Sequence, residues 1–270
     1  NIDDIQNQQI LNGHLNIDKI LLSDLHPFLE TLEQLKGDIT GNVAVAGTLQ
    51  DPLLNGELNV SDINLEGEQL PVVLQKSNVN ILFDKTTATI KGNLNDTQGG
   101  KINLTGDVDW QGAQPEVNVS VNGEQFFVRA QQGVTFKVSP DLTIGLANNA
   151  LKLSGEVIVP YGRVMIEELP EGAVQVSDDE IIVDQQTETA ENVPFDYDVN
   201  LKVIVKNDVK IESFGLESKI AGDLAIKMSQ GAPIIATGEL NLIDGTYLAF
   251  GQDLIISTGQ IGFSGSIEQP

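Results

Sequence analysis

The 270-residue sequence lacks cysteine and has only two histidines, His14 and His26. Without cysteine, disulfide frameworks, thiolate zinc sites and cysteine nucleophiles are excluded. Two histidines make histidine-rich metal sites and Ser-His-Asp arrangements hard to build. Cations are also scarce, because 15 Lys and Arg stand against 39 Asp and Glu and give a formal net charge of −24. This negative net charge argues against a nucleic-acid partner and against electrostatic binding to an anionic membrane surface.

Long hydrophobic runs are missing as well. No stretch approaches the roughly 20 consecutive apolar residues of a membrane helix, and no basic-then-apolar signal peptide begins at Asn1. We therefore expect either a cytosolic protein or an excised piece of an exported one. Hydrophobic residues make up 40% of the chain, enough for a sizeable core and too many for wholesale disorder.

The dominant pattern is strict alternation of apolar and polar residues. It runs through 39–49, 101–110, 116–121 and 195–205. Alternation with a period of two places every second side chain on the same face of a strand. The sequence therefore predicts an all-β fold of antiparallel strands, each with one apolar and one wet face.

A loose motif of glycine followed by alternating polar and apolar residues recurs along these strands. Copies begin at six glycines: Gly13, Gly56, Gly106, Gly155, Gly222 and Gly238. Their spacing is too irregular for a solenoid repeat. We interpret each glycine as a bulge, a bend or a close approach of two backbones.

One segment has a helical pattern. Leu25, Phe28, Leu29, Leu32 and Leu35 would share one face of a helix over residues 24–36. Ser23 or Asp24 would cap this helix and Gly37 would end it, so that it covers a sheet edge or an open end. Residues 111–115 are predicted to form a long turn, and the polar residues 185–192 a mobile loop.

Aromatic residues make up only 5% of the chain, so the apolar faces consist of Val, Ile, Leu, Ala and Gly. Small aliphatic side chains on two facing walls leave space between them. This composition favours a hydrophobic groove with a hydrophilic outer surface. An ordinary packed core remains the alternative, because alternation is a generic signal. A lipid-embedded barrel is disfavoured, since one Trp and three Tyr cannot form aromatic girdles.

Two long motifs carry a resemblance to a known family. They are residues 155–166 (GEVIVPYGRVMI) with 168–174 (ELPEGAV), and residues 244–256 (DGTYLAFGQDLII) with 259–265 (GQIGFSG). Both resemble the C-terminal conserved domain of the TamB family, the inner-membrane subunits of the bacterial translocation and assembly module. Residues 47–58 (GTLQDPLLNGEL) resemble the repeat of the wider AsmA-like group, whose members include bridge-like lipid-transfer proteins.

The resemblance implies an elongated antiparallel β-taco, a U-shaped sheet with a hydrophobic interior groove. Residues 1–184 would form a β-taco segment with the short helix, 185–192 the loop, and 193–270 the continuing strands of what is one domain. The full-length protein would lie in the periplasm of a Gram-negative bacterium, anchored in the inner membrane. Implied partners are a TamA-like outer-membrane barrel protein, phospholipid, and outer-membrane protein or autotransporter substrates.

The implied function is to shield lipid acyl chains during phospholipid transport between the two membranes and to support outer-membrane protein assembly. The predicted lipid-groove residues are the inward apolar side chains Ile39, Val43, Val45, Leu58, Val60, Ile81, Phe83, Ile102, Leu104, Val119, Val121, Phe136, Val138, Leu151, Leu153, Val157, Val199, Leu201, Val203, Val205, Ile220, Leu224, Ile226, Leu240 and Leu242. The alternative is a chaperone-like scaffold that inserts β-barrel proteins through strand augmentation, without lipid conduction.

Catalytic chemistry finds little support. Asp178–Glu180, and Asp196 with Asp198, lack the spacing of an EF-hand calcium loop. Glu167, Glu168 and Glu171 lack the aromatic cleft expected of a secreted carbohydrate-active protein, the third hypothesis. We therefore expect no enzyme activity, no cofactor and no metal.

Overall fold

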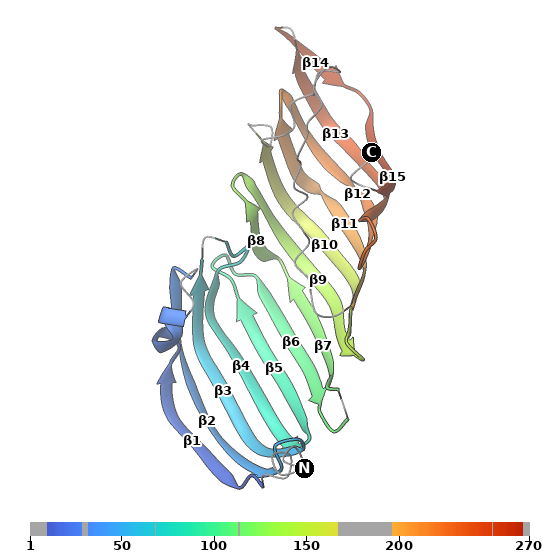
Figure 1. Cartoon of the computed structure of the whole chain (residues 1–270). Coiled ribbons are helices and arrows are strands. Elements are labelled where there is room, and N and C mark those ends of the chain that lie inside the picture. Colours follow the sequence, from blue (N-terminus) through green and yellow to red (C-terminus); the bar gives the residue numbers. More distant parts are fainter. Residues whose placement is uncertain are drawn as a thin grey trace, which may run out of the picture.

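The computed structural model describes residues 10–28, 32–67, 69–112, 114–166, 196–249 and 251–266. Across these residues the chain forms one 15-stranded sheet and a single 3₁₀ helix, so the all-β prediction is confirmed (Figure 1). The elements are β1 (Gly13–Leu21), η1 (Leu22–Phe28), β2 (Gln34–Gly47), β3 (Pro52–Glu66), β4 (Leu74–Lys85), β5 (Thr87–Asn95), β6 (Lys101–Asp109), β7 (Glu116–Glu124), β8 (Phe126–Gln131), β9 (Val134–Ala147), β10 (Ala150–Ile166), β11 (Asp196–Ser213), β12 (Leu216–Ser229), β13 (Ile235–Ala249), β14 (Gln252–Ile256) and β15 (Gly259–Ser266).

Neighbours along the chain are neighbours in the sheet, with two places where one long strand pairs with two short ones. β9 pairs with β8 through residues 134–138 and with β7 through residues 141–146. β13 pairs with β15 through residues 235–242 and with β14 through residues 245–249. The short strands therefore lie end to end beside a long one, and the sheet stays continuous from β1 to β14.

One strand pair departs from the antiparallel expectation. β10 and β11 are parallel, with Leu153 opposite Val199 and Val164 opposite Ile211, while the other strand pairs are antiparallel. A parallel pair needs a crossover connection of a dozen or more residues. The connecting residues 167–195 lie outside the described part of the chain, and so does the predicted loop 185–192.

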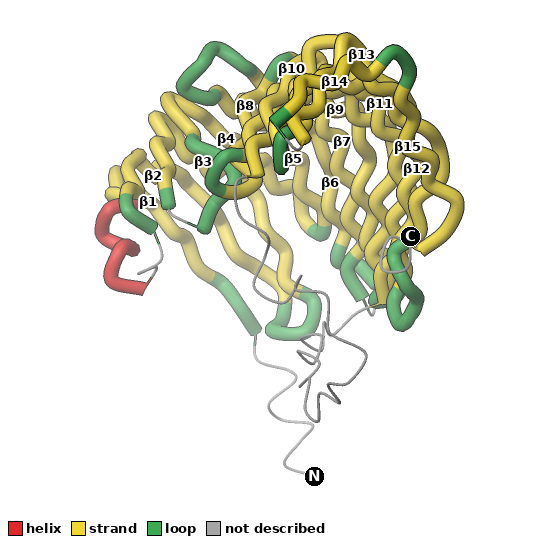
Figure 2. The backbone as a smooth tube through the Cα atoms, turned by 90° about the horizontal axis from the view of Figure 1, so that it is seen from above, coloured by secondary structure: helices red, strands yellow, loops and turns green. Residues whose placement is uncertain are grey.

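The sheet curls about its long axis, so the strands form an arch when seen along that axis (Figure 2). The recurring glycines allow neighbouring backbones to approach closely where it curls. Gly56 has φ 134° and Gly155 has φ 137°, a region that residues with a Cβ avoid. A Cβ built on Gly56 would collide with the carbonyl oxygen of Asn42, and one on Gly155 with that of Asp141. The prediction of close backbone approach is confirmed at these two positions.

The predicted helix over residues 24–36 is wrong in type and extent. The structure has a 3₁₀ helix over Leu22–Phe28, so Asp24 lies inside its first turn rather than capping it. β2 begins at Gln34, and Leu35 is a buried strand residue opposite Leu65. Pro27 lacks the backbone N–H that an α-helix continuing through it would need. From Gln34 onward, pairing with β3 supplies the backbone hydrogen bonds instead. The predicted turn at residues 111–115 does separate β6 from β7.

The convex face of the arch is polar. The amide of Asn80 donates a 2.6 Å hydrogen bond to Asn59 across β3 and β4. Further along the sheet, Lys202 pairs with Glu156 at 3.1 Å across β10 and β11. Since side chains alternate between the faces of a strand, this polar face leaves the apolar residues to the concave side.

Candidate functional site: the concave apolar groove

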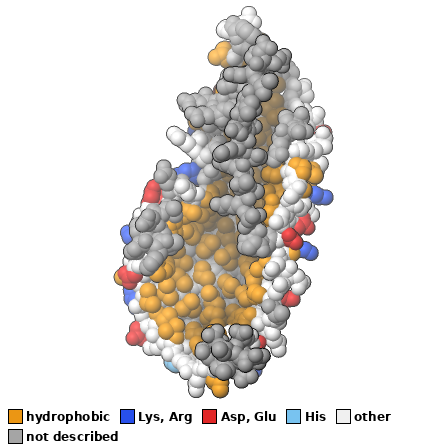
Figure 3. Space-filling model, in the orientation of Figure 1, with side chains coloured by type: hydrophobic (Ala, Val, Ile, Leu, Met, Phe, Trp, Pro, Cys, Tyr) orange, Lys and Arg blue, Asp and Glu red, His pale blue; other side chains and the backbone are white. Residues whose placement is uncertain are grey.

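The strand register brings the predicted groove residues into continuous cross-strand rows. In one row Leu58 lies opposite Ile81, and further along the sheet Val119, Ile144, Leu153 and Val199 are successive partners. In the space-filling view, hydrophobic side chains cover the concave face over the N-terminal strands (Figure 3). Rows that cross so many strands make the apolar face a long strip that runs along the axis of the sheet.

The side chains of this strip are half-buried rather than enclosed. Val43, Ile220 and Leu240 are buried, and the other predicted groove residues are of intermediate exposure. All described strands belong to one sheet, so no second sheet within the described ranges packs on the apolar face. A packed sandwich core would bury these residues fully. The described part of the chain thus forms an open groove.

The C-terminal half of the groove contains a buried hydrophobic cluster. Val159, Val209, Ile220 and Leu240 form a buried cluster there, contributed by β10, β11, β12 and β13. Beside the cluster lies a cavity of about 280 Å³, lined by Phe136, Val138, Val159, Val164, Val203, Val205, Val209 and Ile220. No polar side chain lines it, so its wall is apolar throughout.

Val159, Val164 and Val209 were missed by the sequence reasoning. All three follow bulges or lie next to them, at Val159/Gly162 in β10 and Val205/Val209 in β11. A bulge changes which residues share a face. The alternation signal therefore fails at Val164 and Val209, which follow the register shift, whereas Val159 precedes it and continues the alternation of Val157, so the pattern could have included it.

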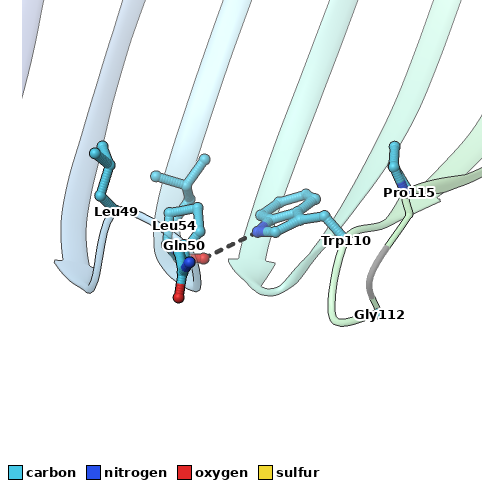
Figure 4. A pocket seen from close by; sticks show the side chains of 7 residues that line it. Leu49, Gln50, Leu54, Trp110, Gly112 and Pro115 are labelled. Carbon is cyan, nitrogen blue, oxygen red and sulfur yellow. Dashed lines mark hydrogen bonds between the residues drawn. The ribbon is translucent and has the colours of Figure 1, made fainter. Parts of the chain in front are cut away.

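The N-terminal half of the groove ends at a second pocket, of about 430 Å³, on the sheet margin. It is lined by Leu49, Gln50, Pro52, Leu54, Trp110, Gly112 and Pro115 (Figure 4). The indole Nε1–H of Trp110 donates a 2.9 Å hydrogen bond to the carbonyl oxygen of Pro52. Its ring meets Phe83 edge-to-face, with centroids 6.5 Å apart. The alternation over residues 101–110 puts Trp110 on the apolar face, but its contact with Pro52, 58 residues away, leaves no local signal.

Buried polar groups near the groove are paired. The single hydroxyl proton of Ser218 is shared between the carbonyl oxygens of Lys219 and Ile243, which lie 2.9 and 3.1 Å from its Oγ. Asp96 is 5% exposed, and its carboxylate accepts backbone N–H groups of Gln98, Gly100 and Phe127. Among the described residues no buried side-chain nitrogen or oxygen lacks a partner. The fold itself therefore satisfies the hydrogen-bonding capacity of these buried polar groups.

No group of three His, Asp or Glu side chains within the described ranges could hold a metal ion. Asp196 and Asp198 lie exposed on β11. The other acidic residues considered from the sequence, Asp178–Glu180, Glu167, Glu168 and Glu171, lie outside the described residues. None of the helices in the described ranges is long and apolar enough to span a membrane.

The fold and groove define a class: an all-β, taco-like protein whose single curled sheet presents an apolar concave face and a polar convex one. The comparison with protein families makes this specific. Residues 87–270 match the TamB C-terminal domain and residues 1–60 match the TamB N-terminal domain, so the chain belongs to the TamB family. The resemblance drawn from the sequence motifs is confirmed.

A curated relative matches along the whole chain. It is the translocation and assembly module subunit TamB of Haemophilus influenzae, which is 29% identical over 283 residues. The match covers 100% of this chain and 22% of the relative, so the chain spans about a fifth of that protein's length. No solved structure matches the chain.

Proposed function

We propose that this chain is a segment of a translocation and assembly module subunit whose groove shields the acyl chains of phospholipids passing between the inner and outer membranes. The supporting observation is the half-buried apolar strip on the concave face of one continuous sheet. The name of the Haemophilus influenzae relative supports the assignment to the module. Shielding of this kind requires no catalytic step. The full protein would work in the periplasm, anchored in the inner membrane, with a TamA-like barrel as its partner.

The energetics favour shielding over tight capture. An acyl chain that crosses water exposes its methylene groups at a cost of roughly 0.8 kcal/mol each. A chain leaving a bilayer is already dry, so the groove gains nothing from dehydrating it and needs only to keep it from water. A wall of half-exposed Val, Ile and Leu side chains does this without holding the chain strongly.

The chemistry of the wall suits sliding. Hydrogen bonds or ion pairs to a lipid would have to break at every step along the groove. Charged residues occupy the alternate positions instead, as Glu57 does beside Leu58 and Lys202 beside Val203. An acyl chain that moves from strand to strand therefore meets similar aliphatic surfaces along the way.

A charge placed in the wall tests this proposal. Val203 lines the C-terminal cavity, whereas its neighbour Ile204 lies opposite Asp223 on the other face. We expect Val203→Asp to abolish retention of co-purified phospholipid, since an acyl chain cannot solvate a carboxylate. The matched control Ile204→Asp should retain lipid at the level of the unmodified chain.

Native mass spectrometry of the folded variants, with lipid extraction of the same samples, measures the retained lipid. Circular dichroism confirms that both variants fold. Equal lipid in the two variants, or no lipid in the unmodified chain, would contradict the shielding proposal.

A second candidate function, a chaperone-like scaffold for outer-membrane β-barrel proteins, is favoured by the sheet edges. β1 has one described neighbour, β2, and carries the exposed side chains of Leu15, Ile20 and Leu21. An open edge with apolar side chains can accept an extended segment by β-augmentation.

The edge and the groove are separable by crosslinking. If the scaffold function operates, a photoreactive residue replacing Asn16, which lies on the edge strand β1 and faces away from the groove, should crosslink to an unfolded outer-membrane barrel protein. The same residue replacing Leu201 in the groove should crosslink to lipid. Capture of barrel protein at Leu201 alone would count against strand augmentation at β1.

A further inference from the structure

Four cations share one cross-strand row in the C-terminal half of the sheet. The strand register makes five residues of β8 to β12 successive partners: Arg129, Thr135, Arg163, Lys210 and Lys219. The four cations, here called the cationic row, include both arginines of the chain. In a chain with a net charge of −24, the row is a local reversal of charge.

The cationic row projects from the convex face. Three residues that line the C-terminal cavity are next in sequence to a cation of the row: Val164, Val209 and Ile220. Successive side chains of a strand alternate between the two faces, so Arg163, Lys210 and Lys219 point away from the cavity. The same holds for Arg129, whose preceding residue in β8 pairs with Phe136 of the cavity.

Most of the cationic row is not neutralised within the protein. Among the described residues, Arg129, Lys210 and Lys219 form no ion pair. The fourth cation, Arg163, contacts Glu212 at 3.3 Å, and its side chain is 52% exposed. The charge of the row is therefore available to a partner outside the described part of the chain.

The cationic row also differs from the way in which the sheet pairs charges elsewhere on the convex face. Lys202 pairs with Glu156 at 3.1 Å, and Lys152 lies opposite Asp198. Lys210 instead lies between two cations of the adjacent strands. Like charges at directly opposing positions destabilise a sheet. An anion bound along the row would relieve this repulsion.

The row is narrow, because carboxylates border it on both sides. On one side Glu212 lies opposite Glu217, and on the other Asp223 lies opposite Glu239. A flat anionic bilayer would meet these carboxylates together with the row, and a long nucleic acid would meet the rest of an acidic protein. A short extended acidic segment can lie along the row alone.

The residues beside the row suit a protein partner. Tyr161 precedes Arg163 by two residues in β10, is 40% exposed and lies opposite Lys137. Tyrosine and arginine are enriched at protein interfaces. A guanidinium can donate two parallel hydrogen bonds to one carboxylate. The bulge of β11 next to the row adds one cation and one carboxylate, Lys206 and Asp208.

We propose that the cationic row binds an extended acidic segment of a partner protein. The row spans roughly 19 Å, since neighbouring strands lie about 4.8 Å apart. An extended segment of about six residues covers this length at roughly 3.3 Å per residue, and its alternate side chains present carboxylates to the row. The segment lies across the strands on the face opposite the groove, so this inference does not rest on lipid shielding.

Peptide binding to the 270-residue chain tests the proposal. The probe is a fluorescent peptide in which glutamate alternates with serine, and a second peptide has glutamine in place of glutamate. Fluorescence anisotropy measures both affinities. We expect the glutamate peptide to bind at low salt and the glutamine peptide not to bind. Moderate salt should weaken the binding, because exposed charges are screened.

Two double variants locate the binding surface. Lys210→Gln with Lys219→Gln should weaken binding of the glutamate peptide by about four- to twenty-five-fold, roughly two- to fivefold for each exposed ion pair. The matched control, Lys152→Gln with Lys202→Gln, changes the net charge equally on the same face but outside the row. It should weaken binding by less than about twofold. Circular dichroism checks that both variants fold.

Three results would overturn the proposal. They are no binding of the glutamate peptide, equal binding of the glutamine peptide, and equal weakening by the two double variants. A sedimentation assay with phosphatidylglycerol vesicles tests the other anionic occupant. Vesicle binding that is lost in the Lys210→Gln, Lys219→Gln variant, without binding of the peptide, would assign the row to a membrane surface and overturn the protein partner.

Discussion

Substituting Gly155 tests the local geometry that lets the sheet curl. The backbone of Gly155 has φ 137°, which an alanine reaches only with strain of roughly 1–3 kcal/mol. The new Cβ would also collide with the carbonyl oxygen of Asp141 and lie 2.9 Å from the Cα of Leu142. Both atoms belong to the paired strand β9, so neither can move without disturbing the ladder. We expect Gly155→Ala to lower the free energy of unfolding by about 3 kcal/mol.

The matched control is Gly145, which lies on β9 opposite Lys152. A Cβ there would have its closest contact at 3.7 Å, and its φ is not in the positive region. Gly145→Ala should be neutral or stabilise the protein by about 0.5 kcal/mol, because alanine loses less entropy on folding. Urea unfolding followed by circular dichroism measures both variants. Equal effects of the two substitutions would refute the argument that close backbone approach, rather than glycine content, shapes the sheet.

Substitutions at three further positions test individual contacts of the fold, each by urea unfolding. Asp96→Ala removes the acceptor of three backbone N–H groups and should lower the free energy of unfolding by about 3 kcal/mol. Asp96→Asn keeps one acceptor oxygen and should lower it by less. An equal loss of stability in both variants would count against the hydrogen-bond argument. Val209→Ala enlarges the cavity beside a side chain that is 1% exposed and should cost about 2 kcal/mol; a neutral result would mean that the cluster is loosely packed. Lys202→Ala breaks an ion pair whose lysine side chain is 54% exposed, and a loss above about 1 kcal/mol would contradict the assignment of this pair to the solvated face.

Much of the groove could be predicted from the sequence because period-two alternation maps directly onto the faces of a strand. Val199, Leu201, Val203 and Val205 are successive examples, all on the same face of β11. The glycine motif likewise predicted close backbone approach at Gly155. Both signals are local, because they depend on neighbouring residues in the sequence and not on distant strand partners.

Features that depend on distant partners were not predictable in this way. Leu32 and Leu35 fit the period of a helix, yet Leu35 lies in a strand and pairs with Leu65. The strand pairing with β3 therefore overrides the local preference for a helix. The parallel pairing of β10 with β11 and the hydrogen bond from Trp110 to Pro52 each join residues far apart in sequence. The buried acceptor role of Asp96 had a local signal, since an aspartate four residues before Gly100 fits a tight turn. Its bond to Phe127 had none.

The most direct test of the central claim is a photo-crosslinking scan along β11, from Val199 to Val205. A photoreactive amino acid is placed at each position in turn, in cells that make the full-length protein, and crosslinked phospholipid is detected by mass spectrometry. The account predicts a period of two, with lipid adducts at Val199, Leu201, Val203 and Val205 and none at the three intervening positions, which face the solvent. Adducts without this period, or their absence at all seven positions, would contradict the claim that the concave face carries lipid.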